Sequence, residues 1–198
     1  MKRLYTVIDF ETTGLDAKVE QITEVAAIKI DEDGNEVGRF HTFVNLTEGR
    51  KPSPYAKVTE EQCATGVGAY GALISLHHFV ADTTVVAQYV PFDFSYLPFR
   101  PLRFVCTRAL NWMLDPEENP SLGVTCERLG IEVLDEHRAV DDVLMTIQLF
   151  LHQKKRAEEL ELDYENTVVD FQKRPLQYIP AHAKVVKEVK EETAEKQE

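Results

Sequence analysis

The segment "VIDFETTGL" at residues 7–15 places two acids in what is otherwise the pattern of a buried strand. Leu4–Phe10 is rich in β-branched and aromatic residues, which predicts a central strand covered on both faces. Side chains two positions apart on a strand point to the same face, so Asp9 and Glu11 would lie roughly 6.6 Å apart along the strand. At an effective dielectric constant of 20, two such charges repel by about 2.5 kcal/mol. The chain therefore has to place positive charge between these carboxylates or keep one of them protonated.

The hydrophobic pattern along the rest of the chain predicts an α/β fold. Residues 21–30 and 36–45 are typical of two strands, and the Asp33-Gly34 turn between them predicts a hairpin. Two further strands are expected at 83–88 and 102–107. Helices are expected after the loop at 51–62, at 69–80, from near Asp93 after a turn through Pro91, up to Trp112, at 121–131 with Gly130 as its stop, and at 139–160. Strands followed by strand–helix alternation predict a mixed five-stranded sheet flanked by helices, in which the second and third strands are antiparallel to their neighbours.

The length of 198 residues suits one domain with a substantial core, which we place at residues 1–163. Beyond Tyr164 the periodic pattern decays. Residues 164–198 are therefore expected to form a C-terminal extension that lies partly extended against the domain and ends in a disordered, charge-rich tail.

Composition limits the function classes and the cellular compartment. The net charge of −12 argues against a protein that coats duplex nucleic acid by backbone electrostatics, unless metal ions supply positive charge locally. Three widely separated cysteines, an odd number with no C-x-x-C pair, argue against a disulfide framework or a zinc site. The chain shows neither a signal-peptide core nor a stretch apolar enough to cross a membrane. We therefore expect a cytoplasmic protein.

Two further acids and a histidine bear on the problem set by Asp9 and Glu11. Asp93 follows a short strand in "VPFDFSYL", and Asp142 opens the long helix in "HRAVDD", five residues after His137. In such a sheet, strand ends and helix starts converge at one edge, where ligands usually bind. Two hard divalent cations, Mg²⁺ or Mn²⁺, would balance four carboxylates there and would suit phosphodiester cleavage. An imidazole beside them is suited to take a proton from an attacking water.

The strings "DFETTG", "FD" and "HRAVDD", in this order and approximate spacing, resemble the DEDDh exonucleases over roughly residues 3–155. That group includes the proofreading epsilon subunit of bacterial DNA polymerase III. The resemblance implies a ribonuclease H-like fold and removal of nucleotides from 3′ ends. It also implies metal ligation by Asp9, Glu11, Asp93 and Asp142, with His137 as general base. By the same resemblance, the first-motif residues Thr12, Thr13 and Leu15 would contact the terminal nucleotide.

This chain departs from the family pattern in the second motif. Gln88-Tyr89 stands where family members have His-Asn, and Val143 replaces the alanine after the last aspartate. The acids also have simpler interpretations: hydration at a strand end for Asp9 and Glu11, a helix N-cap for Asp93, and a favourable helix-dipole contact for Asp142. Arg100, Arg103 and Arg108 flank a strand; they would either reach a nucleic-acid backbone or, as the simpler expectation, pair with some of the many acids.

From these observations we predict a metal-dependent 3′→5′ exonuclease that hydrolyses single-stranded DNA ends by a two-metal mechanism. The alternatives are an exoribonuclease acting on RNA ends, and an impaired exonuclease fold retained as a nucleic-acid-binding module. Because the chain is acidic, a polymerase or helicase partner would provide additional binding to the nucleic-acid substrate.

Overall fold

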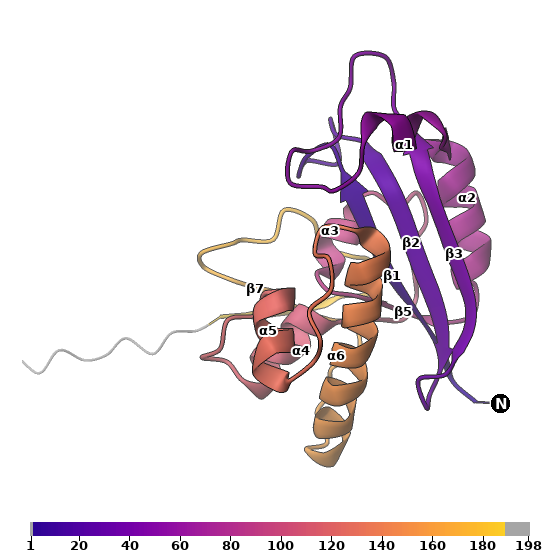
Figure 1. Ribbon diagram of the computed structural model, residues 1–198. Coiled ribbons are helices and arrows are strands. Elements are labelled where there is room, and N and C mark those ends of the chain that lie inside the picture. The colour runs from indigo at the N-terminus through magenta and orange to yellow at the C-terminus, as the bar shows by residue number, and fades with distance from the viewer. Residues whose placement is uncertain (1, 189–198) are drawn as a thin grey trace, which may run out of the picture.

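The computed structural model describes residues 2–188, and within them the main sheet has six strands in the order β4-β3-β2-β1-β5-β6 (Figure 1). Their bounds are Leu4–Thr12 for β1, Ile22–Asp31 for β2, Glu36–Asn45 for β3, Val67–Gly68 for β4, Thr84–Ala87 for β5 and Phe104–Cys106 for β6. β2 runs antiparallel to β1 and β3, whereas β5 is parallel to β1 and β6. The predicted mixed α/β sheet is therefore confirmed.

The expectation of five strands was wrong by one. The additional strand, β4, has two residues and pairs in parallel with the outer edge of β3 at Val44 and Asn45. Two residues are too few for an alternating pattern, so periodicity cannot detect such a strand. β3 is consequently antiparallel to β2 but parallel to its other neighbour.

The helices are α1 (Glu60–Ala64), α2 (Ala69–Val80), α3 (Val90–Ser95), α4 (Thr107–Leu114), α5 (Leu122–Leu129) and α6 (Ala139–Glu159). Gly130 ends α5 in the left-handed conformation, with φ of 69°, as its position predicted. The predicted start of α3 near Asp93 was wrong. α3 begins at Val90 and holds Pro91 in its first turn, where proline is tolerated because the missing N–H has no helical partner. Within the described part of the chain, no helix combines the length and apolarity that a membrane crossing requires.

Helices lie on both sides of the main sheet (Figure 1), and core residues fill both faces of β1 and β2. Ile8 and Phe10 point to the face covered by α2 and α3, while Tyr5 and Val7 point to the face covered by α6. Because side chains alternate along a strand, Asp9 and Glu11 continue the row of Tyr5 and Val7. The hydrophobic core thus directs both acids toward the start of α6.

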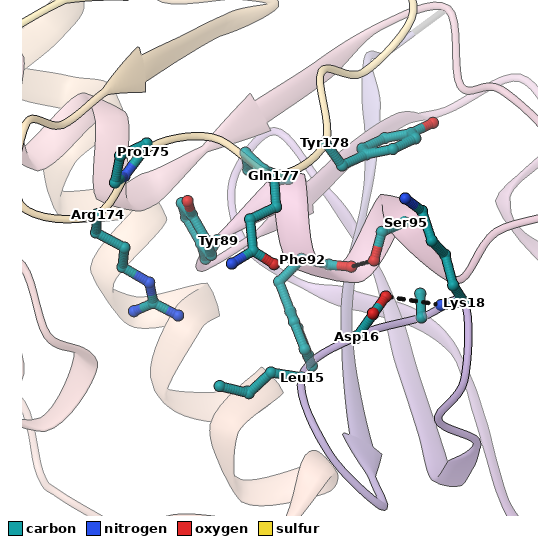
Figure 2. Close-up of a pocket in the computed structure, with 12 residues that line it drawn as sticks. Leu15, Asp16, Lys18, Tyr89, Phe92, Ser95, Arg174, Pro175, Gln177 and Tyr178 are labelled. Carbon is teal, nitrogen blue, oxygen red and sulfur yellow. Dashed lines mark hydrogen bonds between the residues drawn. The ribbon is translucent and has the colours of Figure 1, made fainter.

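The segment after Tyr164 packs against the same core. β7 (Thr167–Asp170) pairs in parallel with β8 (Lys184–Lys187), and Val168 and Val169 are buried. Farther along, Arg174 to Tyr178 pass over Tyr89 and Phe92, with which they line one cavity (Figure 2). The boundary at residue 163 stays a prediction, and the predicted disordered tail falls largely on residues 189–198, which lie outside the described residues.

Gly66, which leads into β4, has no room for a side chain. A Cβ there would lie 2.7 Å from the Val44 backbone nitrogen and closer still to the Phe43 carbonyl. We expect Gly66→Ala to lower the free energy of unfolding by about 1–3 kcal/mol, because backbone cannot move aside as a side chain can. In the matched control Gly71→Ala, the new methyl group meets nothing within 4 Å on α2, so we expect a gain of about 0.5–1 kcal/mol. Equal effects of the two variants in urea denaturation would contradict this assignment.

Candidate active site

The predicted site residues come from three separate parts of the chain and meet at one end of the sheet. They line a single cavity of about 570 Å³, to which β1 and the loop after it contribute Asp9, Glu11, Thr12, Thr13 and Leu15, α3 contributes Asp93, and the start of α6 with its preceding loop contributes His137 and Asp142. The convergence expected from the strand ends and helix starts is therefore present in the structure. Asp93 lies inside the first turn of α3 and is not its N-cap, a position that Tyr89 occupies.

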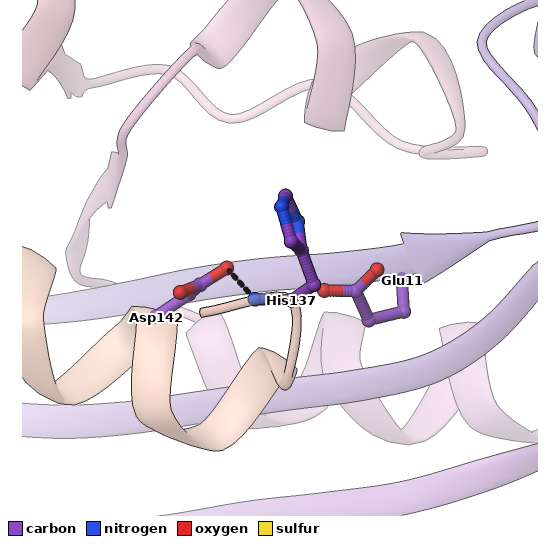
Figure 3. A group of neighbouring side chains, drawn as sticks. All are labelled: Glu11, His137 and Asp142. Carbon is purple, nitrogen blue, oxygen red and sulfur yellow. Dashed lines mark hydrogen bonds between the residues drawn. The ribbon is translucent and has the colours of Figure 1, made fainter. Parts of the chain in front are cut away.

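Glu11, His137 and Asp142 form the tightest part of this group (Figure 3). Each offers one candidate ligand atom, and these three atoms all lie within 4.8 Å of one another. Asp9 and Asp93 are outside this triple but line the same cavity. The arrangement suits a metal ion held by carboxylate oxygens and one imidazole nitrogen.

Burial and mutual repulsion raise the pKa of each of these acids above the usual value for a carboxyl group. Burial, followed by the charges of Asp142 and Glu24, raises the pKa of Glu11 to about 8. Burial raises the pKa of Asp93 to about 8 and that of Asp142 to about 7. For Asp9, burial and then the charge of Asp93 raise the pKa well above its usual value. A site that binds protons this readily at neutral pH is one that a cation would also stabilise.

Two carboxylate oxygens in the site are buried without a hydrogen-bond partner among the described residues. These are Oδ1 of Asp93 and Oδ1 of Asp142. A buried acceptor without a partner costs about 1–3 kcal/mol, which a bound cation or a water molecule would offset. Hard divalent cations prefer carboxylate oxygens, and the residues present therefore fit such ions.

Glu24, which the sequence reasoning did not single out, fixes the start of α6. Its side chain on β2 is fully buried and lies opposite Glu11 in the strand pairing. Oε2 accepts a hydrogen bond of 3.1 Å from the Ala139 backbone, and Oε1 accepts bonds from Arg138 (3.3 Å) and His41 (2.7 Å). Burial would raise the pKa of Glu24, but the bonds from His41 and Ala139 and the Arg138 charge lower it below its usual value. The first turn of α6, and with it Asp142, is thereby held against the sheet.

His137 has a constrained backbone and an accessible ring. Its φ of 69° is unusual for a residue other than glycine, and such strain often marks a functional position. The His137 N–H donates to Asp142 Oδ2 at 3.3 Å (Figure 3), and its carbonyl accepts from the Lys57 N–H at 2.9 Å. The side chain is exposed at the cavity. These bonds position the imidazole beside the acids without occupying its nitrogens.

The loop after β1 forms the rim of the cavity. The Thr12 hydroxyl donates to the Gly14 carbonyl at 2.6 Å, the Thr13 hydroxyl bonds within the same loop, and Tyr96 donates to the Gly14 carbonyl at 2.8 Å. Leu15, by contrast, is 72% exposed. The loop is thus internally braced and presents an apolar side chain to the open cavity. Substrate contacts by Thr12, Thr13 and Leu15 stay a prediction.

The altered second motif has a structural role in this chain. The Gln88 side chain donates to the Pro120 carbonyl at 2.9 Å, which ties the end of β5 to the loop before α5. The Tyr89 ring lines the cavity next to Arg174. Neither change displaces Asp93, which keeps its place among the acids.

Sequence reasoning missed several residues that line or support the site. Tyr55, which is 80% exposed, lies across the cavity on the loop after β3, and Arg174 reaches it from the C-terminal segment. The signal for Glu24 was visible, because a lone acid interrupts the buried strand "QITEVAAIKI". No comparable signal marked Tyr55 or Arg174, because loop and extension residues follow no period.

A mixed sheet with clustered acids and a histidine at one end defines a nuclease that hydrolyses phosphodiester bonds. The chain belongs to the exonuclease family, whose model matches residues 6–150. It is 32% identical over 160 residues to DNA polymerase III PolC-type from Thermotoga petrophila, which covers 74% of this chain and 12% of that protein. The chain therefore corresponds to a small part of these relatives.

Solved structures with the same fold include several exonucleases. Exonuclease X in complex with 5′ overhanging duplex DNA has a TM-score of 0.66 and 25% identity, over 78% of this chain and 93% of that one. The nuclease domain of 3′hExo, a DEDDh family member bound to rAMP, has a TM-score of 0.66 and 13% identity, over 78% and 93%. E. coli exonuclease I in complex with a dT13 oligonucleotide has a TM-score of 0.70 and 18% identity, over 81% and 43%. These likenesses confirm the ribonuclease H-like fold.

The raised pKa values predict how the metal-free protein responds to pH. A carboxyl whose pKa is higher in the folded than in the unfolded chain stabilises the fold at low pH, and that contribution is lost as pH rises through the folded value. In EDTA, the melting temperature should therefore fall as the pH rises from about 4 to about 8. The reason is that Glu11, Asp93 and Asp142 lose their protons in the folded protein over this range. Mn²⁺ or Mg²⁺ should raise the melting temperature more at pH 8.5 than at pH 5.5, because ions favour the ionised carboxylates.

Scanning calorimetry with and without EDTA measures this difference directly. Asp142→Asn should shrink the metal-induced rise, whereas Asp141→Asn, a change of the neighbouring acid that does not line the cavity, should keep it. An equal rise at both pH values would contradict the assignment of these acids.

Glu24 should be far more important for stability than a surface acid. Glu24→Ala leaves Arg138 and the Ala139 N–H without their buried acceptor, so we expect a loss of about 3–5 kcal/mol in the free energy of unfolding. The control Glu36→Ala breaks an exposed pair with Arg39 within β3, for which the loss should be at most about 1 kcal/mol. Urea denaturation compares the two, and similar losses would contradict the anchoring role of Glu24.

Proposed function

We propose that this chain is a divalent-metal-dependent 3′→5′ exonuclease that releases mononucleotides from single-stranded DNA. The observation that carries the proposal is the gathering of four acids and one histidine, from distant segments, around one cavity. Support for DNA comes from the PolC-type relatives and from the exonuclease X and exonuclease I structures, which contain DNA. The 3′ direction rests on the resemblance to the DEDDh enzymes.

Asp9, Glu11, Asp93 and Asp142 are proposed to hold two ions, Mg²⁺ or Mn²⁺. Their raised pKa values and the two buried oxygens without partners are what suits them to this role. When bound, such ions would activate the attacking water and neutralise charge on the scissile phosphate. The residues themselves supply a rigid set of oxygen ligands, because the strand and helix backbones that carry them are anchored in the core.

His137 is proposed to accept the proton of the attacking water. Its ring is exposed to the cavity, and its candidate ligand atom lies within 4.8 Å of those of Glu11 and Asp142. The bonds at its backbone hold the ring near the reacting atoms, as a general base requires. Thr12, Thr13 and Leu15 are proposed to contact the terminal nucleotide at the rim.

The wider setting of this activity is also a proposal. The chain spans about an eighth of the length of the PolC-type relatives, so a polymerase or helicase partner stays a prediction. Among the described residues, Cys63, Cys106 and Cys126 are free and buried. The cytoplasmic location stays a prediction.

A second candidate function is removal of nucleotides from RNA ends. The 3′hExo structure, which contains rAMP, is the observation that favours it. The third interpretation, an impaired binding module, is motivated by Gln88-Tyr89. Against it, all four acids and His137 line the cavity.

A 5′-labelled single-stranded oligonucleotide separates these functions. With Mg²⁺ or Mn²⁺, removal from the 3′ end gives a ladder of labelled products that shorten one nucleotide at a time. Removal from the 5′ end gives a labelled mononucleotide at once. Asp9→Asn and His137→Ala should each reduce the rate at least about 100-fold, because each would remove a group that participates in the reaction.

Asp141→Asn is the matched control and should keep the rate close to that of the unchanged protein. An RNA of the same sequence, run in parallel, decides between the two nucleic acids. Shortening that persists in EDTA, or in the Asp9→Asn variant, would contradict the proposed function, and so would the absence of any shortening.

A further inference from the structure

Arg174 is a cation that the C-terminal segment brings to the active-site cavity. It lines the same cavity as the acids, and its guanidinium carbon lies 4.7 Å from the centroid of the Tyr89 ring. Figure 2 shows its side chain beside Tyr89 in a neighbouring cavity, which Leu15 also lines. Arg174 is exposed, and it lies at the wall of the active-site cavity.

Arg108 packs against the same Tyr89 ring from the start of α4. Its guanidinium carbon lies 5.5 Å from the Tyr89 centroid and 5.4 Å from that of Phe171. It also lines a second cavity of about 430 Å³, whose lining includes His137 and Asp142. Both arginines thus lie close to the Tyr89 ring of the altered second motif.

Neither arginine has an acidic partner within ion-pair distance among residues 2–188. The simpler expectation that Arg108 pairs with an acid was therefore wrong. Nε of Arg108 is also buried without a hydrogen-bond partner in this part of the chain. Burial and the charge of Arg174 both lower the pKa of Arg108, so the two cations repel each other. In a chain with 34 acids and 22 lysines and arginines, two adjacent cations without acids indicate a place for an external anion.

The backbone that carries Arg174 is well anchored. The Arg174 N–H donates to the Phe171 carbonyl at 3.1 Å, and the Leu176 N–H donates to Asp170 Oδ1 at 3.0 Å. Phe171 and Leu176 pack against the hydrophobic core. The turn from 171 to 176 therefore presents Arg174 from a braced position, which lowers the entropic cost of using it for binding.

We propose that Arg174 and Arg108, held by the Tyr89 ring, bind the phosphate backbone of the nucleic-acid strand next to the nucleotide being removed. This inference rests on the proposed function and names a substrate contact that the catalytic residues do not supply. Guanidinium groups suit phosphate oxygens because they donate two parallel hydrogen bonds and stay charged. In this proposal Tyr89, which replaces the asparagine of the family pattern, orients Arg174 from the extension and Arg108 from α4.

Two substrates of different length test the proposal. Thymidine 5′-monophosphate p-nitrophenyl ester has only the phosphate to be attacked, whereas a 12-nucleotide strand also offers neighbouring phosphates. In Arg174→Gln, the ratio of kcat/KM for the oligonucleotide to kcat/KM for the ester should fall about tenfold, the scale of one lost charge-assisted contact. The matched control is Lys173→Gln, which removes a positive charge from the adjacent exposed residue that lines neither cavity, and it should keep the ratio.

A binding measurement gives an independent readout. In the Asp9→Asn background, which keeps the labelled oligonucleotide intact, anisotropy is followed against salt concentration. The slope of log affinity against log salt should become shallower by about 0.7 in the Arg174→Gln chain, as expected for one phosphate contact to a single strand. Arg108→Lys, which keeps charge but loses the fork geometry, should lower affinity with little change in slope.

The outcomes distinguish this inference from the proposed function. If the unchanged protein cleaves both substrates but Arg174→Gln keeps the ratio and the salt slope, the phosphate site is wrong and the exonuclease assignment stands. An equal effect of Lys173→Gln would also overturn the site, because a general loss of charge would then explain it. If the unchanged protein cleaves neither substrate, the proposed function fails, and this site fails with it.

Discussion

Repulsion among buried carboxylates is the constraint on which the rest of the site depends. Asp9 and Glu11 point the same way because β1 alternates its faces, and the core fixes that direction with Tyr5 and Val7 in the same row. Asp93 and Asp142 are then added from two helices, which raises the pKa of every member. A folded protein tolerates this cluster only with bound protons or bound cations, and the proposed divalent-metal site meets that requirement.

The contrast with Glu24 shows which buried acid is structural. Glu24 is as deeply buried as any of the others, yet donors from Arg138, Ala139 and His41 surround its carboxylate, and its pKa is lowered. Its task is to hold the first turn of α6 against β2. Among the acids proposed as metal ligands, Asp93 and Asp142 instead each keep one buried oxygen without a hydrogen-bond partner. Full hydrogen bonding identifies the structural acid, and missing partners identify those available to a ligand.

The C-terminal segment changes how the second motif is understood. As a string, Gln88-Tyr89 is only a departure from the family pattern. In the fold, Gln88 ties β5 to the loop before α5, while Tyr89 packs against Arg174 from the extension and Arg108 from α4. The motif and the extension therefore form one surface, which supplies positive charge beside an acidic catalytic centre. An acidic chain needs such local cations if it is to hold a polyanion near a cluster of carboxylates.

The sequence by itself determined the long periodic elements and the acids. Strands β1 to β3, helices α2 and α6, and the stop at Gly130 follow from alternation, helical spacing and backbone preference, all of which are local. The tertiary structure alone decided β4, β7, the true start of α3, and the roles of Glu24 and Arg174. Each of these depends on a partner far away in the chain: a two-residue strand exists only through β3, and an arginine without an acid is recognised only when its neighbours are known. Local preference predicts elements, whereas charge balance and hydrogen-bond partners belong to the folded chain as a whole.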